Sequence, residues 1–355
     1  MRVDRWYRFT LAFFMGWIWG TFLIQNMHYQ PVVQPNIEPH ALQDTKPKHP
    51  QKRSQNMITK HGQRCTQEQA ANIAAQEPIM NSNCPDKSTW MPEYVKSSRN
   101  NPDAVLMWIG CNRGDDLAEA MRVWSRNTSY QTDLMQPYYV QFYGQRSCML
   151  DTSAHIDNFT VRPVRGFCVE AMTSTFEVVN RIYSELAWNS AVEVIHAAVS
   201  SIPGISSFPR HSPGFEAFGL ESKSDSSDLV QVITVDSLVA KYGLTSIDVL
   251  SIDTEGNDMR VIFGAVHTLP KVKYLEFEYH NVNRWGQSDL QDLIDLLDQF
   301  DFDCFWTGNN GQLWRLTGCW HDSYYSKRFW SNVACSKRNE QALHQAMVKH
   351  SFLSF

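Results

Sequence analysis

Ile247–Asp258 has the sequence IDVLSIDTEGND, in which a mainly apolar run leads directly into a cluster of carboxylates. The apolar part, Ile247–Ile252, has the hydrophobicity of a strand that is buried on both faces. A helical stretch follows, Met259–Ala265, and then a second apolar strand, Val272–Glu278. Strands that alternate with helices in this way predict an α/β fold with a mostly parallel sheet.

The same alternation continues on both sides of this stretch. A capping box formed by Ser174 and Glu177 opens one apolar stripe at helical spacing, and Ser288 precedes another. A central sheet flanked by helices is therefore expected for most of the chain. The remaining expected strands are Ala104–Ile109, Val164–Val169, Val192–His196, Val230–Thr234, Asp303–Trp306, Leu313–Leu316 and Asn332–Cys335.

The 355 residues divide into a folded body and an N-terminal extension. We predict that the body spans residues 102–340, with an insertion at about 128–163, and that a tail follows at 341–355. Residues 28–101 are rich in Pro, Gln, Asn and Lys, a composition typical of a flexible stalk. Hydrophobic residues make up 43% of the chain, which is enough for a sizeable core.

The N-terminus predicts a membrane anchor. Arg2, Arg5 and Arg8 precede Phe9–Ile24, a run without charge that is close to the ~17 residues needed to span a bilayer. A cationic flank stays in the cytoplasm. We therefore expect residues 1–27 to be a cytoplasmic stub and signal-anchor helix of a single-pass type II membrane protein, with the body in the Golgi or ER lumen. A cleaved signal peptide, which lacks a small-x-small site here, and an interfacial helix are the alternatives.

Charge and cysteine spacing exclude two classes. Lys and Arg number 32 and Asp and Glu 37, so the formal net charge is −5. This balance argues against a nucleic-acid partner, which would need a dominant basic surface. The eight cysteines contain no C-x-x-C pair, which argues against a zinc ribbon or finger. Two glycosylation acceptor triplets, Asn127–Ser129 and Asn158–Thr160, agree with a lumenal glycoprotein.

The even number of cysteines permits disulfides in an oxidising lumen but does not fix their pairing. Cys65 with Cys84, and Cys319 with Cys335, are the pairs that we consider plausible. The alternative for each pair is two buried free thiols.

Ligands of parallel α/β sheets bind at the carboxyl ends of the strands, so the residues just after each strand are informative. Gly110 and Gly114 follow the first strand and let the backbone approach a ligand, although glycines are also common in ordinary turns. Glu170 follows the second strand, where an acid can bind ribose hydroxyls or simply charge a helix N-terminus. Asp253 and Glu255 crowd the end of a third strand, which is typical of groups that handle a ligand, metal or proton.

In this order, the segments resemble the motifs of FkbM-type S-adenosylmethionine-dependent methyltransferases. The resemblance extends from about Ala104 to Val282. It has two departures, because Trp108 stands where the family usually has Asp and Ser251 where Lys is common. The matching segments are Ile247–Ala265 with I-D-x-x-K-I-D-x-E-G-x-E and V-L-x-G-A, Ile109–Gly114 with I-G-A-N-x-G, Val169–Ala171 with F-E-P, Ala197–Gly204 with A-V-S-x-x-x-G, and Val235–Leu238 with L-D-x-L.

The resemblance implies a Rossmann-like class I methyltransferase fold with S-adenosylmethionine as its cofactor. Gly110, Asn112 and Gly114 are then expected to form the loop under the amino-acid part of the cofactor. Glu170 is expected to bind its ribose. Asp253 would lie beside the sulfonium or the acceptor.

The reaction implied is methyl transfer to a hydroxyl oxygen, which can need a base for the hydroxyl proton. The candidates are Asp253, Glu255 and His280, in that order, although His280 can also be an ordinary histidine after a buried strand. We predict no metal site, and a divalent metal held by Asp253 and Glu255 is the alternative.

In a secretory lumen, sugars are the abundant hydroxyl-bearing acceptors, so we expect a membrane-anchored O-methyltransferase that acts on a glycan. Trp306 and Trp320 either line a sugar-binding face or pack in the core. Two alternatives remain open. The first is a non-catalytic scaffold with a methyltransferase fold, which Trp108 in the first motif suggests. The second is a lumenal glycosyltransferase, because the sequence Asp301–Asp303 matches an Asp-x-Asp metal site.

Overall fold

The computed structural model describes residues 64–75, 103–143, 162–280, 289–308, 311–326 and 331–351. All of them belong to the unit 58–355. The predicted anchor, residues 1–27, lies outside the described residues, as do most of the predicted stalk and much of the predicted insertion. Among the described residues, no helix combines the length and the apolar character needed to cross a membrane.

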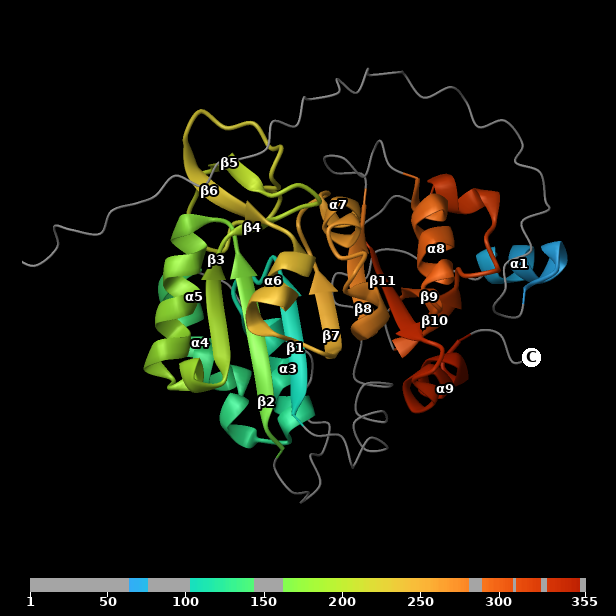
Figure 1. Cartoon of the computed structure of the whole chain (residues 1–355), viewed down its shortest axis with the longest axis horizontal. Coiled ribbons are helices and arrows are strands. Elements are labelled where there is room, and N and C mark those ends of the chain that lie inside the picture. Colours follow the sequence, from blue (N-terminus) through green and yellow to red (C-terminus); the bar gives the residue numbers. More distant parts are fainter. Residues whose placement is uncertain are drawn as a thin grey trace, which may run out of the picture. The chain divides into compact units, whose positions relative to one another are not determined.

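The main sheet consists of β1 (Ala104–Ile109), β2 (Val164–Glu170), β3 (Val192–His196), β7 (Ile247–Ile252), β8 (Val272–Tyr279), β9 (Phe302–Thr307), β10 (Leu313–Arg315) and β11 (Ser331–Lys337). Their order is β10-β9-β11-β8-β7-β1-β2-β3 (Figure 1). The pairs from β8 through β7, β1 and β2 to β3 are parallel, and β9, β10 and β11 pair antiparallel at the other edge. The predicted α/β fold with a mostly parallel central sheet is confirmed.

Helices cover both faces of this sheet because each strand alternates its side chains between them. In β1, Leu106 and Trp108 belong to one apolar cluster, and Met107 and Ile109 to the other. The first cluster is shared with α3 (Asp115–Ser125), α4 (Gln136–Phe142), α5 (Thr173–Glu185) and α9 (Gln341–Lys349), and the second with α6 (Val235–Tyr242), α7 (Asp258–Phe263) and α8 (Leu290–Gln299). Short 3₁₀ helices lie at Thr128–Tyr130, Thr132–Met135, Trp188–Ser190, Leu269–Lys271 and Asp322–Ser326.

A second, smaller sheet consists of β4 (Ala198–Val199), β5 (Gly204–Pro209) and β6 (Ser227–Ile233), in the order β4-β6-β5. The predicted strand at Val230–Thr234 corresponds to the end of β6. In Figure 1 this sheet lies at the top, beyond the carboxyl ends of the parallel strands. It therefore stands beside the edge at which a ligand of such a sheet would bind.

The ends of the predicted body differ from the sequence expectation. Within the predicted stalk, α1 (Gln67–Ala74) begins with a capping box between Thr66 and Gln69, and Ile73 is buried in the core. Within the predicted tail, α9 buries Leu343 and Met347 against the sheet. Both helices are therefore parts of the body. A short helix at Gln67–Gln76 is expected from the sequence, but composition assigned this region to the stalk and residues 341–355 to a tail.

The six described cysteines form the disulfides Cys65–Cys319, Cys111–Cys168 and Cys304–Cys335. The expected pairs of Cys65 with Cys84 and of Cys319 with Cys335 were wrong, as was the alternative of free thiols for the described members. Cys335 faces Cys304 because β11 lies beside β9. Nearness in sequence misled the prediction, since strand order in the sheet does not follow chain order.

We predict that removing the Cys65–Cys319 disulfide destabilises the body. The bond closes a loop of 254 residues, so its loss releases much chain entropy in the unfolded state. The double variant Cys65→Ala, Cys319→Ala should lose roughly 2–5 kcal/mol of unfolding free energy in urea titrations without reductant. Hydrogen exchange should accelerate in α1 and stay slow in β1, and an unchanged titration would contradict the account.

Candidate functional site

A cavity opens at the carboxyl ends of β1, β2 and β7, with an empty volume of about 600 Å³ when its open mouth is included. One part of its lining is polar and acidic, and the other is apolar. The polar lining consists of Asn112, Glu170, Glu216, Asp253, Thr254, Glu255 and Asn257. The apolar lining includes Met172, Ala198, Val199, Phe208, Phe215, Phe218 and Leu220.

The glycine turn after β1 is pressed against the end of β7. Gly110 has a φ of +80°, and a Cβ placed there would lie 1.6 Å from the backbone oxygen of Asp253. The backbone nitrogen of Asp253 donates to the oxygen of Ile109 at 2.8 Å. Only glycine can satisfy this backbone angle and this contact together, so Gly110 brings the two strand ends into one site.

The other glycine of the turn has a packing role. Gly114 caps α3 with a φ of +80°, and a Cβ there would meet the side chains of Val179 and Tyr183 at 2.7 and 2.8 Å. The hydroxyl of Tyr183 donates a hydrogen bond to the backbone carbonyl oxygen of Gly114. Gly110 and Asn112 line the cavity, whereas Gly114 does not.

Glu170 ends β2 and lines the cavity, with only 7% of its surface exposed. One carboxylate oxygen accepts the backbone N–H of Asn112 at 2.9 Å, and the other that of Met172 at 2.8 Å. Burial raises the pKa of Glu170, and the backbone donors oppose this shift. Each oxygen retains acceptor capacity, so the fixed carboxylate can receive hydroxyl donors such as those of a ribose.

Trp108 lies away from the cavity. Its neighbour in β1, Ile109, lines the cavity, and alternation along the strand sends Trp108 into the core on the other face. There it packs in the same cluster as Leu106 and Trp124. The Trp in place of the family's usual Asp therefore does not fill the site.

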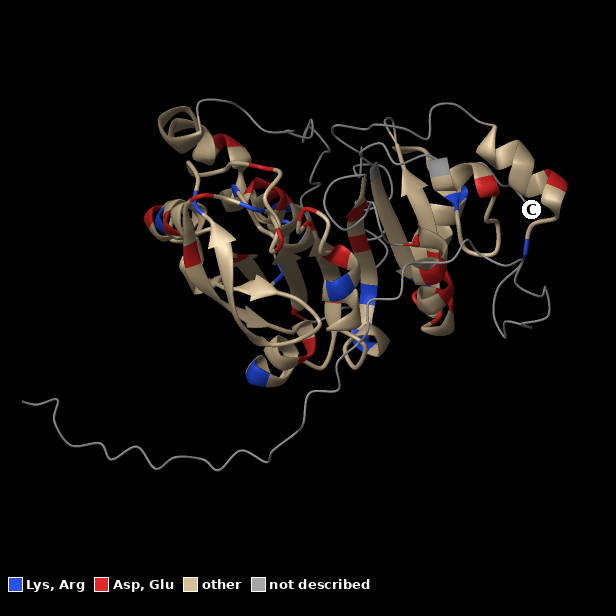
Figure 2. Ribbon diagram, turned by 90° about the horizontal axis from the view of Figure 1, so that it is seen from above, with Lys and Arg blue, Asp and Glu red and all other residues tan. Residues whose placement is uncertain are grey.

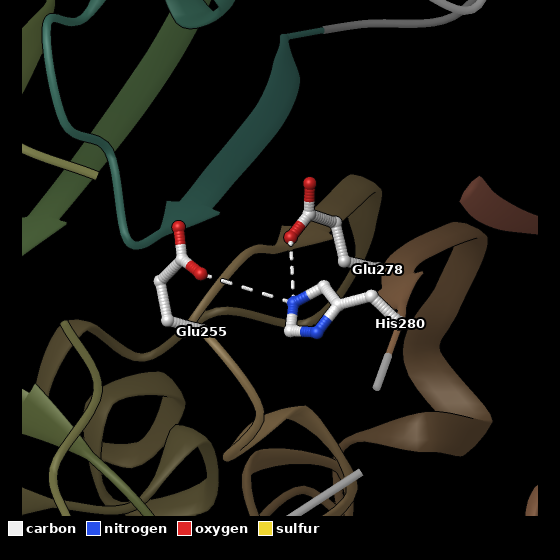
Figure 3. A group of neighbouring side chains, drawn as sticks. All are labelled: Glu255, Glu278 and His280. Atoms are coloured by element: carbon white, nitrogen blue, oxygen red, sulfur yellow. Dashed lines mark ion pairs between the residues drawn. The ribbon is translucent and has the colours of Figure 1, made fainter. Parts of the chain in front are cut away.

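Two of the residues predicted as proton acceptors, Glu255 and His280, come together with Glu278 at the acidic end of the cavity (Figure 3). His280 Nε2 lies 3.3 Å from Glu278 Oε2 and 3.8 Å from Glu255 Oε2. Asp253 is hydrogen-bonded to Glu278 through their side chains. Asp253 and Glu255 both line the cavity, whereas His280 lies next to Glu255 and outside the lining.

The charges of this group shift its pKa values. Burial, together with Glu278 and Glu255, raises the pKa of Asp253 well above its ordinary 3.8. Burial and Glu278 also raise the pKa of Glu255. Burial disfavours the charged form of His280, but the hydrogen bond and the charge of Glu278 outweigh it and raise the pKa. A carboxylate with a raised pKa is a stronger base than one with its ordinary pKa.

A loop between β5 and β6, residues 210–226, borders the cavity and contacts the glycine turn. Arg113 pairs with Glu216 at 3.4 Å and donates to the backbone oxygen of Gly214 at 3.3 Å. The loop also supplies Phe215 and Phe218 to the apolar lining, with their rings 4.8 Å apart. Flat apolar side chains of this kind suit an aromatic ring such as a nucleobase.

Several residues of the site were missed by sequence reasoning. Glu278 could have been found, because it ends the expected strand two residues before His280, and extended chain places residues two apart on the same side. Asp258 belongs to the carboxylate cluster of the signature, but the sequence assigned it no role. Phe208, Phe215 and Phe218 carried no signal, because nothing local tells which loop covers a sheet end.

Two other sequence hypotheses concern residues outside the cavity. Trp306 is buried beside Tyr279 and Tyr324, and Trp320 packs against Tyr324, so both take part in core packing. Asp303 of the Asp-x-Asp spelling is buried and pairs with Arg315 at 3.1 Å and Arg338 at 2.9 Å. Asp303 therefore has a structural role, because its negative charge offsets the charges of the two arginines.

In comparisons with known protein families, residues 77–304 match the family described as "Methyltransferase FkbM domain". No curated protein matches the chain. Among solved structures, the METTL16 MTase domain is 6% identical with a TM-score of 0.33, over 70% of this chain and 64% of that one. Precorrin-6y C5,15-methyltransferase from Geobacter metallireducens GS-15 is 10% identical with a TM-score of 0.32, over 74% and 99%. A protein from Bordetella parapertussis, described as a "possible exported protein", is 9% identical with a TM-score of 0.31, over 77% of this chain and 79% of that one.

We predict that Gly110→Ala disrupts the site far more than a matched glycine change. Gly243 also has a positive φ, of +62°, but no atom lies within 4 Å of its would-be Cβ. Gly243→Ala should therefore cost only about 1 kcal/mol of unfolding free energy, and Gly110→Ala about 4 kcal/mol or more. Thermal melts of both variants measure the difference, and equal losses would contradict the contact with Asp253.

Proposed function

The chain belongs to the methyltransferase FkbM domain family and is an S-adenosylmethionine-dependent methyltransferase, and we propose that it methylates a hydroxyl oxygen of a glycan in the secretory lumen. In this proposal residues 1–27 anchor it as a type II membrane protein of the Golgi or ER. The observation that carries the proposal is the cavity in which the glycine turn, Glu170 and Asp253 meet.

The residues of the cavity fit S-adenosylmethionine. The close approach at Gly110 leaves the backbone of the turn accessible at the cavity wall, where Asn112 would lie beside the amino-acid part of the cofactor. Glu170 is held by two backbone donors in a position suited to ribose hydroxyls. Met172, Phe208 and Phe218 form an apolar surface suited to the adenine ring.

The cofactor supplies an activated methyl group on a sulfonium, which a nucleophilic oxygen can accept in one displacement. The chain's own residues must hold the acceptor oxygen in line and remove its proton. The carboxylate of Asp253 would take the proton from the acceptor hydroxyl, because it lines the cavity and its pKa is raised. The loop 210–226 and its aromatic side chains would exclude water.

Two features support a lumenal glycan acceptor. Three disulfides join described cysteines, a number that fits an oxidising compartment. A net charge of −5 does not favour a nucleic-acid acceptor. Trp108, the reason to consider a non-catalytic scaffold, packs in the core and leaves the cavity open.

The proposal is tested by incubating the full-length chain in detergent with methyl-labelled S-adenosylmethionine and a pool of secreted glycans. We expect labelled methyl ethers that resist mild base, as ethers do and esters do not. Label that appears only in esters or in protein side chains would contradict O-methylation of a glycan.

We predict that Glu170→Gln weakens binding of S-adenosylmethionine by roughly 10- to 100-fold, since an amide replaces one acceptor oxygen by a donor. Glu177→Gln, on the exposed face of α5, is the matched control and should leave the affinity unchanged. Calorimetric titration measures both, with a thermal melt of each variant to confirm folding. Equal affinities for the two variants would show that Glu170 does not hold the cofactor.

We predict that kcat decreases at low pH because Asp253 becomes protonated, which gives the pH profile an acid limb. The base works only when deprotonated, and its pKa lies well above 3.8, so kcat should fall as the pH drops through that raised value. Asp253→Asn should lower kcat by about 10²- to 10⁴-fold and remove the limb. Glu177→Gln, on the exposed face of α5 and outside the cavity lining, should keep both. An unchanged limb in Asp253→Asn would assign the proton to another group.

A further inference from the structure

We propose that Glu255, Glu278 and His280 form a binding site for a divalent cation that accepts both carboxylate and imidazole ligands, as Mn²⁺ does. One atom of each side chain lies within 4.8 Å of the others. Cation binding by this group does not depend on the proposed methyl transfer, whereas the role of the cation in catalysis rests on it.

The spacing of the three atoms suits a shared cation. Ligand atoms ~2.0–2.2 Å from a metal lie about 3 Å apart when adjacent and about 4.3 Å apart when opposite. The distances from His280 Nε2 to Glu278 Oε2 and Glu255 Oε2, 3.3 and 3.8 Å, lie in this range (Figure 3). Small side-chain adjustments would therefore place all three atoms on one cation.

The side chains come from fixed positions on different elements. Glu278 and His280 share one face at the end of β8, because they are two residues apart. Glu255 follows β7 and holds a left-handed backbone with a φ of +53°. For a residue with a side chain this conformation costs about 1 kcal/mol or more, and such strain is found most often at functional sites.

The surrounding charge favours a cation. Asp253, which lines the cavity, and Asp258, which is buried, add two further acids to the group. The negative charges of Glu278, Glu255 and Asp258 act on Asp253 and disfavour its charged form. The hydrogen bond between Asp253 and Glu278 also brings two carboxyl groups together. A divalent cation would offset this repulsion. Figure 2, which views the molecule from above, shows Asp and Glu at several places along the ribbon, with Lys and Arg among them.

A second observation comes from Asp258 at the start of α7. Its Oδ2 accepts Thr254 Oγ1 at 3.1 Å and the backbone N–H of Gly256 at 3.2 Å. Its Oδ1 is fully buried, and no hydrogen bond reaches it within the described part of the chain. Glu278 and His280 are the residues that act most strongly on its charge. A water bound to the cation would satisfy this oxygen.

The cation would be reached from the cavity. The side chain of Glu255 is 20% exposed and lines the cavity, whereas those of Glu278 and His280 are 7% and 5% exposed. Protein ligands occupy three positions, so others stay open to water or to a hydroxyl of the acceptor. A hydroxyl bound there would lose its proton more readily, and Asp253 would receive that proton.

The test uses the full-length chain in detergent, stripped with a chelator and titrated with Mn²⁺ alone. We expect one Mn²⁺ per chain by calorimetry, and nitrogen modulation from a coordinated imidazole in pulsed electron paramagnetic resonance. His280→Gln should remove the modulation and weaken binding at least tenfold. Glu177→Gln, on the exposed face of α5 and outside the cavity lining, should keep both. If His280→Gln does not fold, Glu255→Gln, at a partly exposed position, should weaken binding similarly.

Two outcomes would overturn the site. One is the absence of stoichiometric binding up to millimolar Mn²⁺, in which case the group shares protons instead. The other is binding that persists in the variants without loss. A chain that binds S-adenosylmethionine but no Mn²⁺ refutes the cation site alone, whereas one that binds Mn²⁺ but transfers no methyl group refutes the proposed function alone.

Discussion

The backbone contact between Gly110 and Asp253 is the constraint on which the site depends. It joins the turn after β1 to the residues after β7, and a Cβ at Gly110 would lie only 1.6 Å from the oxygen of Asp253. The turn continues into Asn112, whose N–H holds Glu170. Three strand ends are thereby fixed around one cavity, and the polar groups on its wall need no rearrangement before a ligand binds.

Two kinds of environment divide the cavity. Glu170 is a buried acid that backbone donors hold in place, which suits a binding group. Asp253 and Glu255 lie among other carboxylates and beside His280, so their protonation is sensitive to a neighbouring charge. The first environment suits the recognition of a neutral ribose, and the second suits the handling of a proton or a cation.

The parts of the site that local sequence determines could be predicted. Ile247–Ile252 carries its own strand signal, and β7 has these bounds in the structure. Topology, by contrast, decided what was missed. The partner of Cys335 is Cys304 because β11 lies between β8 and β9. Phe218 lines the cavity because its loop joins β5 to β6 of the small sheet. Long-range arrangements of this kind leave no periodic pattern in one sequence.

The central claim is that this cavity holds the adenosine part of S-adenosylmethionine. A crystal structure of the chain with S-adenosylhomocysteine tests it most directly. The account predicts ribose hydroxyl oxygens within hydrogen-bonding distance of the Glu170 carboxylate, with the base beside Phe218. A nucleoside bound elsewhere, or one whose ribose lies away from Glu170, would contradict it.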